Sequence, residues 1–281
     1  MRNLNNQIWL SLLIGLTWII PRTARAQTFT FDYLTAVDKA GIPERSRSFN
    51  PMMTFFFTNG AFDSSGNTSG NLRYLEFRVY FASARNFNRR VQLVIVFDLR
   101  GRLAEGAARS SMGEIWFLTK YRYTQNAPIT LRLGFKLGRL LADDLWLNHN
   151  ELDLGLLLGT DLGDITLTGS LAYRLQGNTA SPFLDFSYRY DNPGNAVHYR
   201  MGVSTRTGTS TRGSLFLIGY QGGDKKTDGM TIKNSFSRKI TAGATFRLFR
   251  NKSETYEFSF LVDLAGRHDM KGISLVVSLL R

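Results

Sequence analysis

Residues 151–174 read "ELDLGLLLGTDLGDITLTGSLAYR" and alternate apolar side chains with polar or small ones. The apolar set comprises Leu152, Leu154, Leu156 and Leu158 before a break at 161–163, and Ile165, Leu167, Leu171 and Tyr173 after it. Because a β-strand points successive side chains to opposite faces, this stretch predicts a hairpin with one apolar and one polar face. A soluble sandwich buries such an apolar face, whereas a transmembrane barrel turns it toward lipid.

The same alternation recurs along most of the chain after residue 71. Besides the hairpin, it predicts strands at 72–83, 91–100, 114–123, 129–138, 183–190, 197–206, 214–221, 240–249, 255–264 and 272–280. Together these give about twelve strands, and two weaker candidates, 28–34 and 52–58, would raise the number to fourteen. Turn-forming connectors and the lack of a compositional boundary predict a single up-and-down antiparallel meander.

Strand length favours the barrel over the sandwich. The predicted strands are close to the ~9–11 residues needed to cross a bilayer at a tilt, and longer than the ~5–6 residues typical of soluble strands. Tyrosines near strand ends fit an interfacial girdle: Tyr121, Tyr123, Tyr173, Tyr188, Tyr190 and Tyr199. The sequence therefore predicts an all-β antiparallel transmembrane β-barrel, with a secreted soluble sandwich as the alternative.

The N-terminal segment predicts export. Arg2 precedes an apolar stretch from Ile8 to Ile20, and Ala24-Arg25-Ala26 forms a cleavage signal before Gln27. This pattern is typical of a secretory signal peptide, and the apolar stretch is short for a retained membrane helix. We therefore expect a signal peptide over residues 1–26, a barrel over 27–281, and insertion in the bacterial outer membrane.

Composition narrows the classes of partner. The chain has no cysteine, which excludes a disulfide scaffold and thiolate chemistry. Its formal net charge of +13 is scattered along the strands, and no nucleic-acid-binding motif occurs. We expect no nucleic-acid partner, and interpret the charge as favouring outer-membrane lipid or a small anionic solute.

Two stretches carry a family resemblance. They are the segment "SSMGEIWFLTKYRYTQNAPITLRLGFKL" (110–137) and the hairpin at 151–174. Both resemble the outer-membrane proteins of the MetA-pathway-of-phenol-degradation family, whose members are classed as transporters. The resemblance implies an outer-membrane barrel that moves small molecules, and it brings no catalytic residues. One departure is the C-terminal Leu280-Arg281, where outer-membrane barrels commonly end in an aromatic residue.

The predicted inward faces carry both signs of charge. The lumen-lining candidates are the bases Arg78, Arg100, Lys120, Arg122, Arg132, Lys136, Arg174, Arg189, Arg200 and Arg247. The acids on the same faces are Glu76, Asp98, Glu114, Asp153, Asp185, Glu257 and Asp263. Two interpretations stay open: a mildly basic aqueous pore that favours anions, or a closed interior in which the charges pair and fill a narrow barrel.

Enzymatic chemistry has little support in the sequence. The histidines His149, His198 and His268 fall in different segments, and no metalloprotease or serine-hydrolase motif occurs. The oxygen-rich segment 142–151 matches no calcium-loop spacing, so we interpret it as a solvated loop. We predict no catalytic residues, no metal and no cofactor.

The predicted connectors conflict with the usual asymmetry of these barrels, whose long loops face the exterior. If the last strand ends in the periplasm, the long connector 222–239 lies outside as expected. The same alternation then places the connector 142–151 inside and the tight turn 161–163 outside. Either these loops break the asymmetry or one predicted strand is wrong.

The function that the sequence favours is a channel or transporter for small solutes that diffuse passively through a mildly basic lumen. The alternatives are a structural or assembly-related barrel with an ion-paired interior and, with less support, a lipid-modifying outer-membrane enzyme.

The signal-peptide prediction is tested by expressing the full chain in a Gram-negative host. N-terminal sequencing is expected to begin at Gln27, and the protein should fractionate with outer membranes and migrate differently on gels when unheated. Recovery as a soluble periplasmic protein would contradict it.

Overall fold

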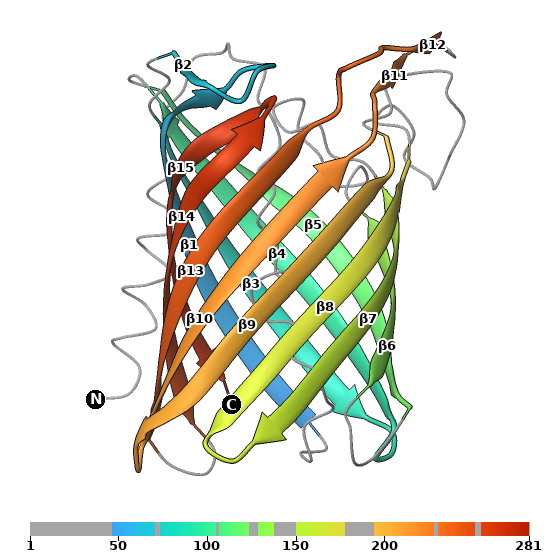
Figure 1. Ribbon diagram of the computed structural model, residues 1–281. Helices are drawn as coiled ribbons and strands as arrows, with labels where there is room; N and C mark the ends of the chain where they lie inside the picture. Colours follow the sequence, from blue (N-terminus) through green and yellow to red (C-terminus); the bar gives the residue numbers. More distant parts are fainter. Residues whose placement is uncertain are drawn as a thin grey trace.

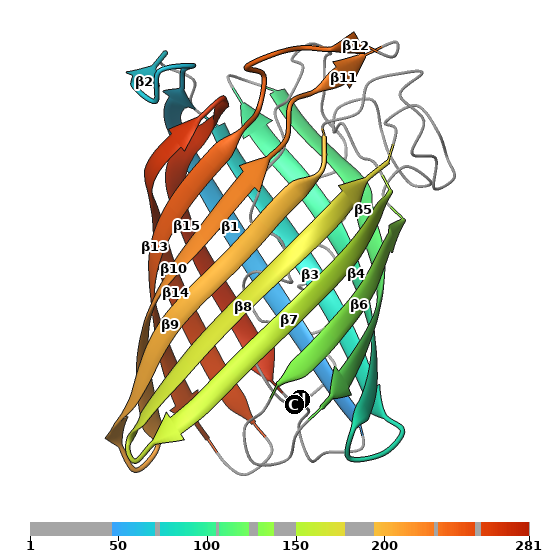
Figure 2. The same ribbon diagram turned by 45° about the vertical axis from the view of Figure 1, so that its right-hand side comes forward.

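A computed structural model describes residues 47–70, 74–104, 107–123, 129–137, 150–177, 194–227, 230–250 and 254–280. These residues form one antiparallel barrel, seen from two sides in Figures 1 and 2. Twelve wall strands follow one another in chain order: β1 (Arg47–Phe62), β3 (Tyr74–Asn86), β4 (Val91–Ala104), β5 (Ala107–Arg122), β6 (Thr130–Leu137), β7 (Glu151–Leu162), β8 (Ile165–Gln176), β9 (Ala196–Gly208), β10 (Thr211–Gly222), β13 (Arg238–Phe249), β14 (Thr255–Arg267) and β15 (Asp269–Leu280). No helix among the described residues is long and apolar enough to cross a membrane.

The barrel closes because β15 pairs with β1, with Phe55 opposite Leu275 near the middle of the register. Closure leaves no wall strand at an open edge, so the backbone groups of each strand can pair on both sides. The predicted all-β, up-and-down barrel of twelve strands is confirmed.

The membership of the twelve differs from the prediction by one strand gained and one lost. The weak candidate 52–58 forms the middle of β1. Residues 28–34 and 183–190 lie outside the described residues. No wall strand stands between β8 and β9, because these two strands pair directly from Ile165 opposite Thr205 to Arg174 opposite Ala196. The prediction of an additional wall strand between them was therefore wrong.

This change resolves the conflict between the predicted connectors. The turns 87–90, 163–164 and 209–210 all join strands at one end of the barrel, which we call the short-turn end. The connectors after β1, β6, β8 and β10 join strands at the opposite end, where β2 (Thr68–Ser69), β11 (Lys226–Thr227) and β12 (Met230–Thr231) lie (Figure 1). Outer-membrane barrels have short periplasmic turns and longer extracellular loops, so the short-turn end corresponds to the periplasmic side.

The hairpin 151–174 folds as its alternation predicts. Strands β7 and β8 pair with Leu154 opposite Tyr173 and Asp153 opposite Arg174. Gly163 in the turn has a φ of 66°, a left-handed conformation that glycine adopts without a Cβ clash. Leu157 is the exception in this hairpin, because it is 1% exposed and lies on the inner face.

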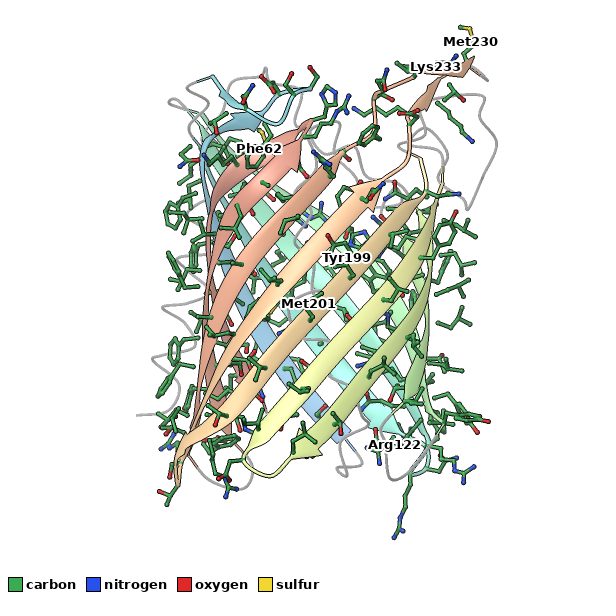
Figure 3. All side chains as sticks on the ribbon, viewed as in Figure 1. Phe62, Arg122, Tyr199, Met201, Met230 and Lys233 are labelled. Carbon is green, nitrogen blue, oxygen red and sulfur yellow. The ribbon has the colours of Figure 1, made fainter. Side chains whose placement is uncertain are left out.

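The outer surface of the barrel is apolar, as the side chains in Figure 3 show around the wall. On β6, Leu131 and Leu133 are 48% and 51% exposed, whereas Arg132 between them is 5% exposed. A soluble sandwich would bury these leucines, so the structure excludes that alternative. Tyr121, Tyr123 and Tyr173 are also exposed, while Tyr188 and Tyr190 lie outside the described residues.

A closed antiparallel barrel with an apolar exterior and a polar interior is the architecture of bacterial outer-membrane proteins. The exposed belt has a large apolar side chain on eleven of the twelve wall strands: Phe57, Ile95, Phe117, Leu133, Leu154, Leu171, Met201, Leu215, Phe246, Phe260 and Leu275. In water this belt would drive aggregation, whereas in a bilayer it contacts acyl chains. The chain is an outer-membrane β-barrel.

The assignment of faces on β6 predicts different effects on folding stability for two substitutions of Leu133. Leu133→Arg should lower the stability of the folded barrel by roughly 2–4 kcal/mol, because it places a charge on the lipid face. Leu133→Phe should have little effect, because the side chain stays apolar in the same environment. Folding yield in lipid vesicles, read by heat-modifiable migration, measures both. A membrane-embedded photoreactive probe should also label Leu133, and failure to label it would reverse the assignment of faces.

Candidate functional site

The interior of the barrel holds most of the charged side chains that the sequence assigned to inward faces. Five predicted bases are at most 5% exposed: Arg78, Arg100, Arg132, Lys136 and Arg174. Four others are half-buried: Lys120, Arg122, Arg200 and Arg247. The predicted acids Glu76, Asp98, Glu114, Asp153, Glu257 and Asp263 are buried. Arg189 and Asp185 lie outside the described residues.

On β3, β4 and β5 these charges form direct ion pairs. Glu76 accepts bonds from Arg78 Nε at 2.8 Å and from Arg102 Nη2 at 2.5 Å. Arg100 donates from Nε to Asp98 at 2.7 Å, and its Nη2 forms an ion pair with Glu114 at 2.7 Å. The Asp98 carboxylate also accepts a bond from the backbone N–H of Glu114. Charges on three neighbouring strands are therefore compensated locally.

The pairing continues across β6, β7 and β8. Lys136 Nζ bridges Glu114 at 3.2 Å and Glu151 at 2.6 Å. Arg174 lies 3.7 Å from Glu151 and donates from Nε to Asp153 at 2.9 Å. Asp153 also accepts two parallel bonds from Arg132, at 2.7 and 3.0 Å. We call the whole set the ion-pair ladder: Glu76, Arg78, Asp98, Arg100, Arg102, Glu114, Arg132, Lys136, Glu151, Asp153 and Arg174.

The ladder is almost neutral, with six basic and five acidic side chains, and no member is more than 7% exposed. Ionised groups removed from water in this way are tolerated only when they are paired and hydrogen-bonded. This half of the interior therefore matches the predicted ion-paired network more closely than a water-lined surface.

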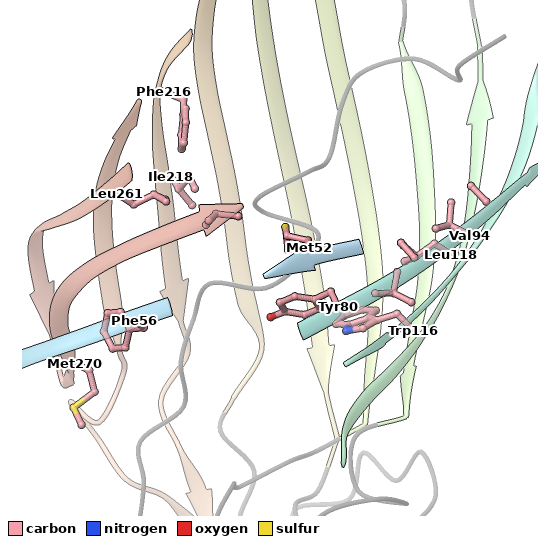
Figure 4. Close-up of a cluster of buried hydrophobic side chains, with 14 of the residues drawn as sticks. Met52, Phe56, Tyr80, Val94, Trp116, Leu118, Phe216, Ile218, Leu261 and Met270 are labelled. Carbon is pink, nitrogen blue, oxygen red and sulfur yellow. The ribbon is translucent and has the colours of Figure 1, made fainter. Parts of the chain in front are cut away.

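Apolar side chains fill the space next to the ladder. Trp116 on β5 is 2% exposed, and its ring lies 5.7 Å from Lys136 Nζ and 5.3 Å from the Arg174 guanidinium carbon. Figure 4 shows Trp116 near Tyr80 and Leu118, with Phe216, Ile218 and Leu261 on the opposite strands. These contacts exclude water around the ladder and strengthen its ion pairs.

The opposite inner face, on β8, β9, β10, β13 and β14, has a different chemistry. Its strand register aligns five hydroxyl side chains, which we call the hydroxyl row: Thr166, Ser204, Ser214, Thr245 and Ser259. Thr166, Ser204 and Ser214 are half-buried, and the Thr245 and Ser259 hydroxyls bond each other at 2.7 Å. Basic residues lie on the same inward positions: Arg200, Arg206, Arg212 and Arg247. This face is more exposed than the ladder.

Acids on the hydroxyl-row face are few and lie at its two ends. Glu257 pairs with Arg247 on the neighbouring strand. Asp263 and Asp269 each lie 3.6 Å from Lys239 Nζ, and Asp263 also accepts a bond from the Thr241 hydroxyl at 2.7 Å. The five bases of this face, Arg200, Arg206, Arg212, Lys239 and Arg247, therefore outnumber its three acids.

Sequence reasoning missed six charged interior residues. These are Arg102, Glu151, Arg206, Arg212, Lys239 and Asp269. Most of them lie just beyond the predicted strand ends. The prediction that Glu151 belongs to a solvated loop was wrong, because Glu151 is 3% exposed and pairs with Lys136. Extending each predicted strand by a few residues would have found Arg102, Arg212, Lys239 and Asp269, because the real strands run past the predicted limits.

The described residues hold no arrangement typical of catalysis. His198 is buried against the Tyr220 ring, with ring centroids 4.8 Å apart. His268 lies in the turn between β14 and β15, and His149 is outside the described residues. Within the described part of the chain, no group of three or more metal-ligating side chains is placed to hold a metal ion.

Comparisons with known proteins identify the fold. An outer membrane channel from Pseudomonas putida F1 aligns with a TM-score of 0.69 at 16% identity, over 87% of this chain and 98% of that one. The chain has the fold of an outer-membrane channel. The NanC porin aligns with a TM-score of 0.48 at 6% identity, over 82% and 98% of the two chains. The CymD monoaromatic hydrocarbon channel gives 0.45 at 9% identity, over 85% and 89%.

Sequence comparisons add no family to this structural likeness. No protein-family model matches the chain, and no curated protein matches it either. The resemblance to the phenol-degradation family therefore stays a prediction.

The ladder predicts a large effect from a nearly isosteric substitution. Asp153→Asn removes the carboxylate that both Arg132 and Arg174 contact, and breaking a buried ion pair typically costs about 3–5 kcal/mol. Denaturant unfolding of the protein in lipid or detergent should show this loss. Asp164→Asn, in the exposed turn before β8, is the matched control and should change stability by less than about 0.5 kcal/mol. Equal stabilities for the two variants would mean that the ladder does not hold the wall.

Proposed function

We propose that the protein is an outer-membrane channel through which small solutes diffuse passively, with a mildly basic lumen that favours anions. The observation that carries this proposal is the division of the interior into two faces. The ladder on β3–β8 is buried and nearly neutral. The hydroxyl-row face is half-exposed, and its bases outnumber its acids.

Exposure on an inward-facing position indicates contact with water. Thr168, Ser170, Ser204 and Ser214 face inward and are half-buried, unlike the ladder residues. Hydroxyl groups can exchange hydrogen bonds with passing water and solute without holding a fixed partner. A path along this face therefore offers weak, repeated contacts, which suit permeation better than tight binding.

The positive charge on the hydroxyl-row face predicts a preference for anions. Arg206, Arg212 and Arg247 lie near the short-turn end, and the single acid paired among them is Glu257. A low-dielectric wall focuses the field of these groups into the lumen and raises the local concentration of anions. Outer-membrane lipid contacts the apolar exterior, and the small solute contacts this inner face.

The ladder favours a second candidate, a structural barrel whose paired interior admits no solute. Ion pairs and Trp116 fill the inner surface of β3–β8. The two candidates differ in what they predict for the hydroxyl-row face, since a structural barrel does not need water-accessible arginines there.

Planar-bilayer recording separates the two candidates. Purified, heat-modifiable protein should insert and give discrete conductance steps, and the reversal potential in a KCl gradient should show preference for chloride. Swelling of proteoliposomes should show uptake of small solutes. Properly folded protein that neither conducts nor supports swelling would instead support the structural barrel.

A further inference from the structure

Three arginines face one another across neighbouring strands near the short-turn end. The register places Arg206 on β9 opposite Arg212 on β10, and Arg212 opposite Arg247 on β13. Like charges directly opposite in an antiparallel sheet repel and destabilise it. We call these three residues the arginine row.

The arginine row differs from every other cation cluster in the described interior. Arg247 pairs with Glu257, but neither Arg206 nor Arg212 forms an ion pair with any residue that the structure describes. Arg206 is exposed and Arg212 is half-buried. Arg200 on β9 adds further positive charge to the same inner face, and its guanidinium carbon lies 4.5 Å from the centroid of the Phe216 ring.

The hydroxyl row lies directly beside the arginine row. Ser204, Ser214 and Thr245 precede or follow the three arginines by two residues on the same strands, so they share the inner face. Hydroxyl groups and guanidinium forks are the donors that carboxylate and phosphate groups accept from. The wall therefore presents adjacent donors with an excess of positive charge.

The geometry points to an oxyanion-binding site: we infer that the arginine row binds the carboxylate or phosphate group of a solute at the periplasmic mouth of the channel. This inference rests on the proposed channel function and names its substrate class. The site faces inward, so the sheet separates it from the acyl chains, and the anion reaches it from the aqueous lumen. Two or three guanidinium groups can share one oxyanion, which relieves their mutual repulsion.

Citrate and inorganic phosphate are the probes, and the double variant Arg206→Gln, Arg212→Gln removes the two uncompensated charges. In planar bilayers, citrate added on the short-turn side should block the wild-type current, and the variant should need about tenfold more citrate, as loss of a charged hydrogen bond predicts. Chloride preference should also fall in the variant. The same measurement with inorganic phosphate distinguishes two kinds of site. Both probes block the current if the site binds oxyanions in general, and only citrate blocks it if the site selects carboxylates.

Two matched variants define what the result means. Arg89→Gln, Arg90→Gln removes two charges from the exposed turn 87–90 at the same end and should leave citrate block unchanged. Arg206→Lys, Arg212→Lys keeps the charge but loses the guanidinium fork, so chloride preference should persist while citrate block weakens.

Unchanged citrate block in the conducting glutamine variant would overturn the arginine row as a binding site and leave the channel standing. Absence of conductance from folded wild-type protein would overturn the channel instead. Calorimetric titration of citrate into detergent-solubilised protein still tests the row in that case, and equal affinities of wild type and glutamine variant would contradict it.

Discussion

The structure depends on one constraint: a sheet in lipid must close so that no backbone N–H or C=O group is left without a partner. The pairing of β15 with β1 meets this constraint, and the period of two along each strand then assigns every side chain to lipid or to the interior. A charge on an inward position cannot reach the outer aqueous phase by a rotamer change. It must be neutralised by a neighbour or hydrated inside the barrel.

The two halves of the interior meet this requirement in different ways. On β3–β8, acids and bases alternate across strands, so that each cation reaches a carboxylate on its own strand or the next. On β9, β10 and β13, only Arg247 of the three arginines pairs with an acid, so water and mobile anions must compensate the charge of the other two. The ion pairs of β3–β8 link neighbouring strands. The arginines of β9 and β10 carry positive charge that an anionic solute can compensate.

The sequence predicted the closed barrel and its faces because both follow from local alternation. Leu131, Arg132 and Leu133 lie where the period of two places them. It failed between β8 and β9, which pair directly where an additional wall strand was predicted. It also failed at strand ends, where Arg102 and Lys239 continue the inward series beyond the predicted limits. The correct strand membership also explained the connectors, since one strand too many reverses the direction of every strand on one side of it.

The contacts between charged side chains inside the barrel could not be predicted from the sequence, for a different reason. That Arg132 contacts Asp153, or that Arg206 faces Arg212, depends on the register between strands, which is set by the shear of the closed barrel rather than by either strand alone. The sequence could count bases and acids on the inward faces, but only the register separates a compensated arginine from an uncompensated one. Net lumen charge is therefore a poor guide to selectivity here. The six cations of the ladder are paired with its five carboxylates, whereas the register brings Arg206, Arg212 and Arg247 together with one paired acid.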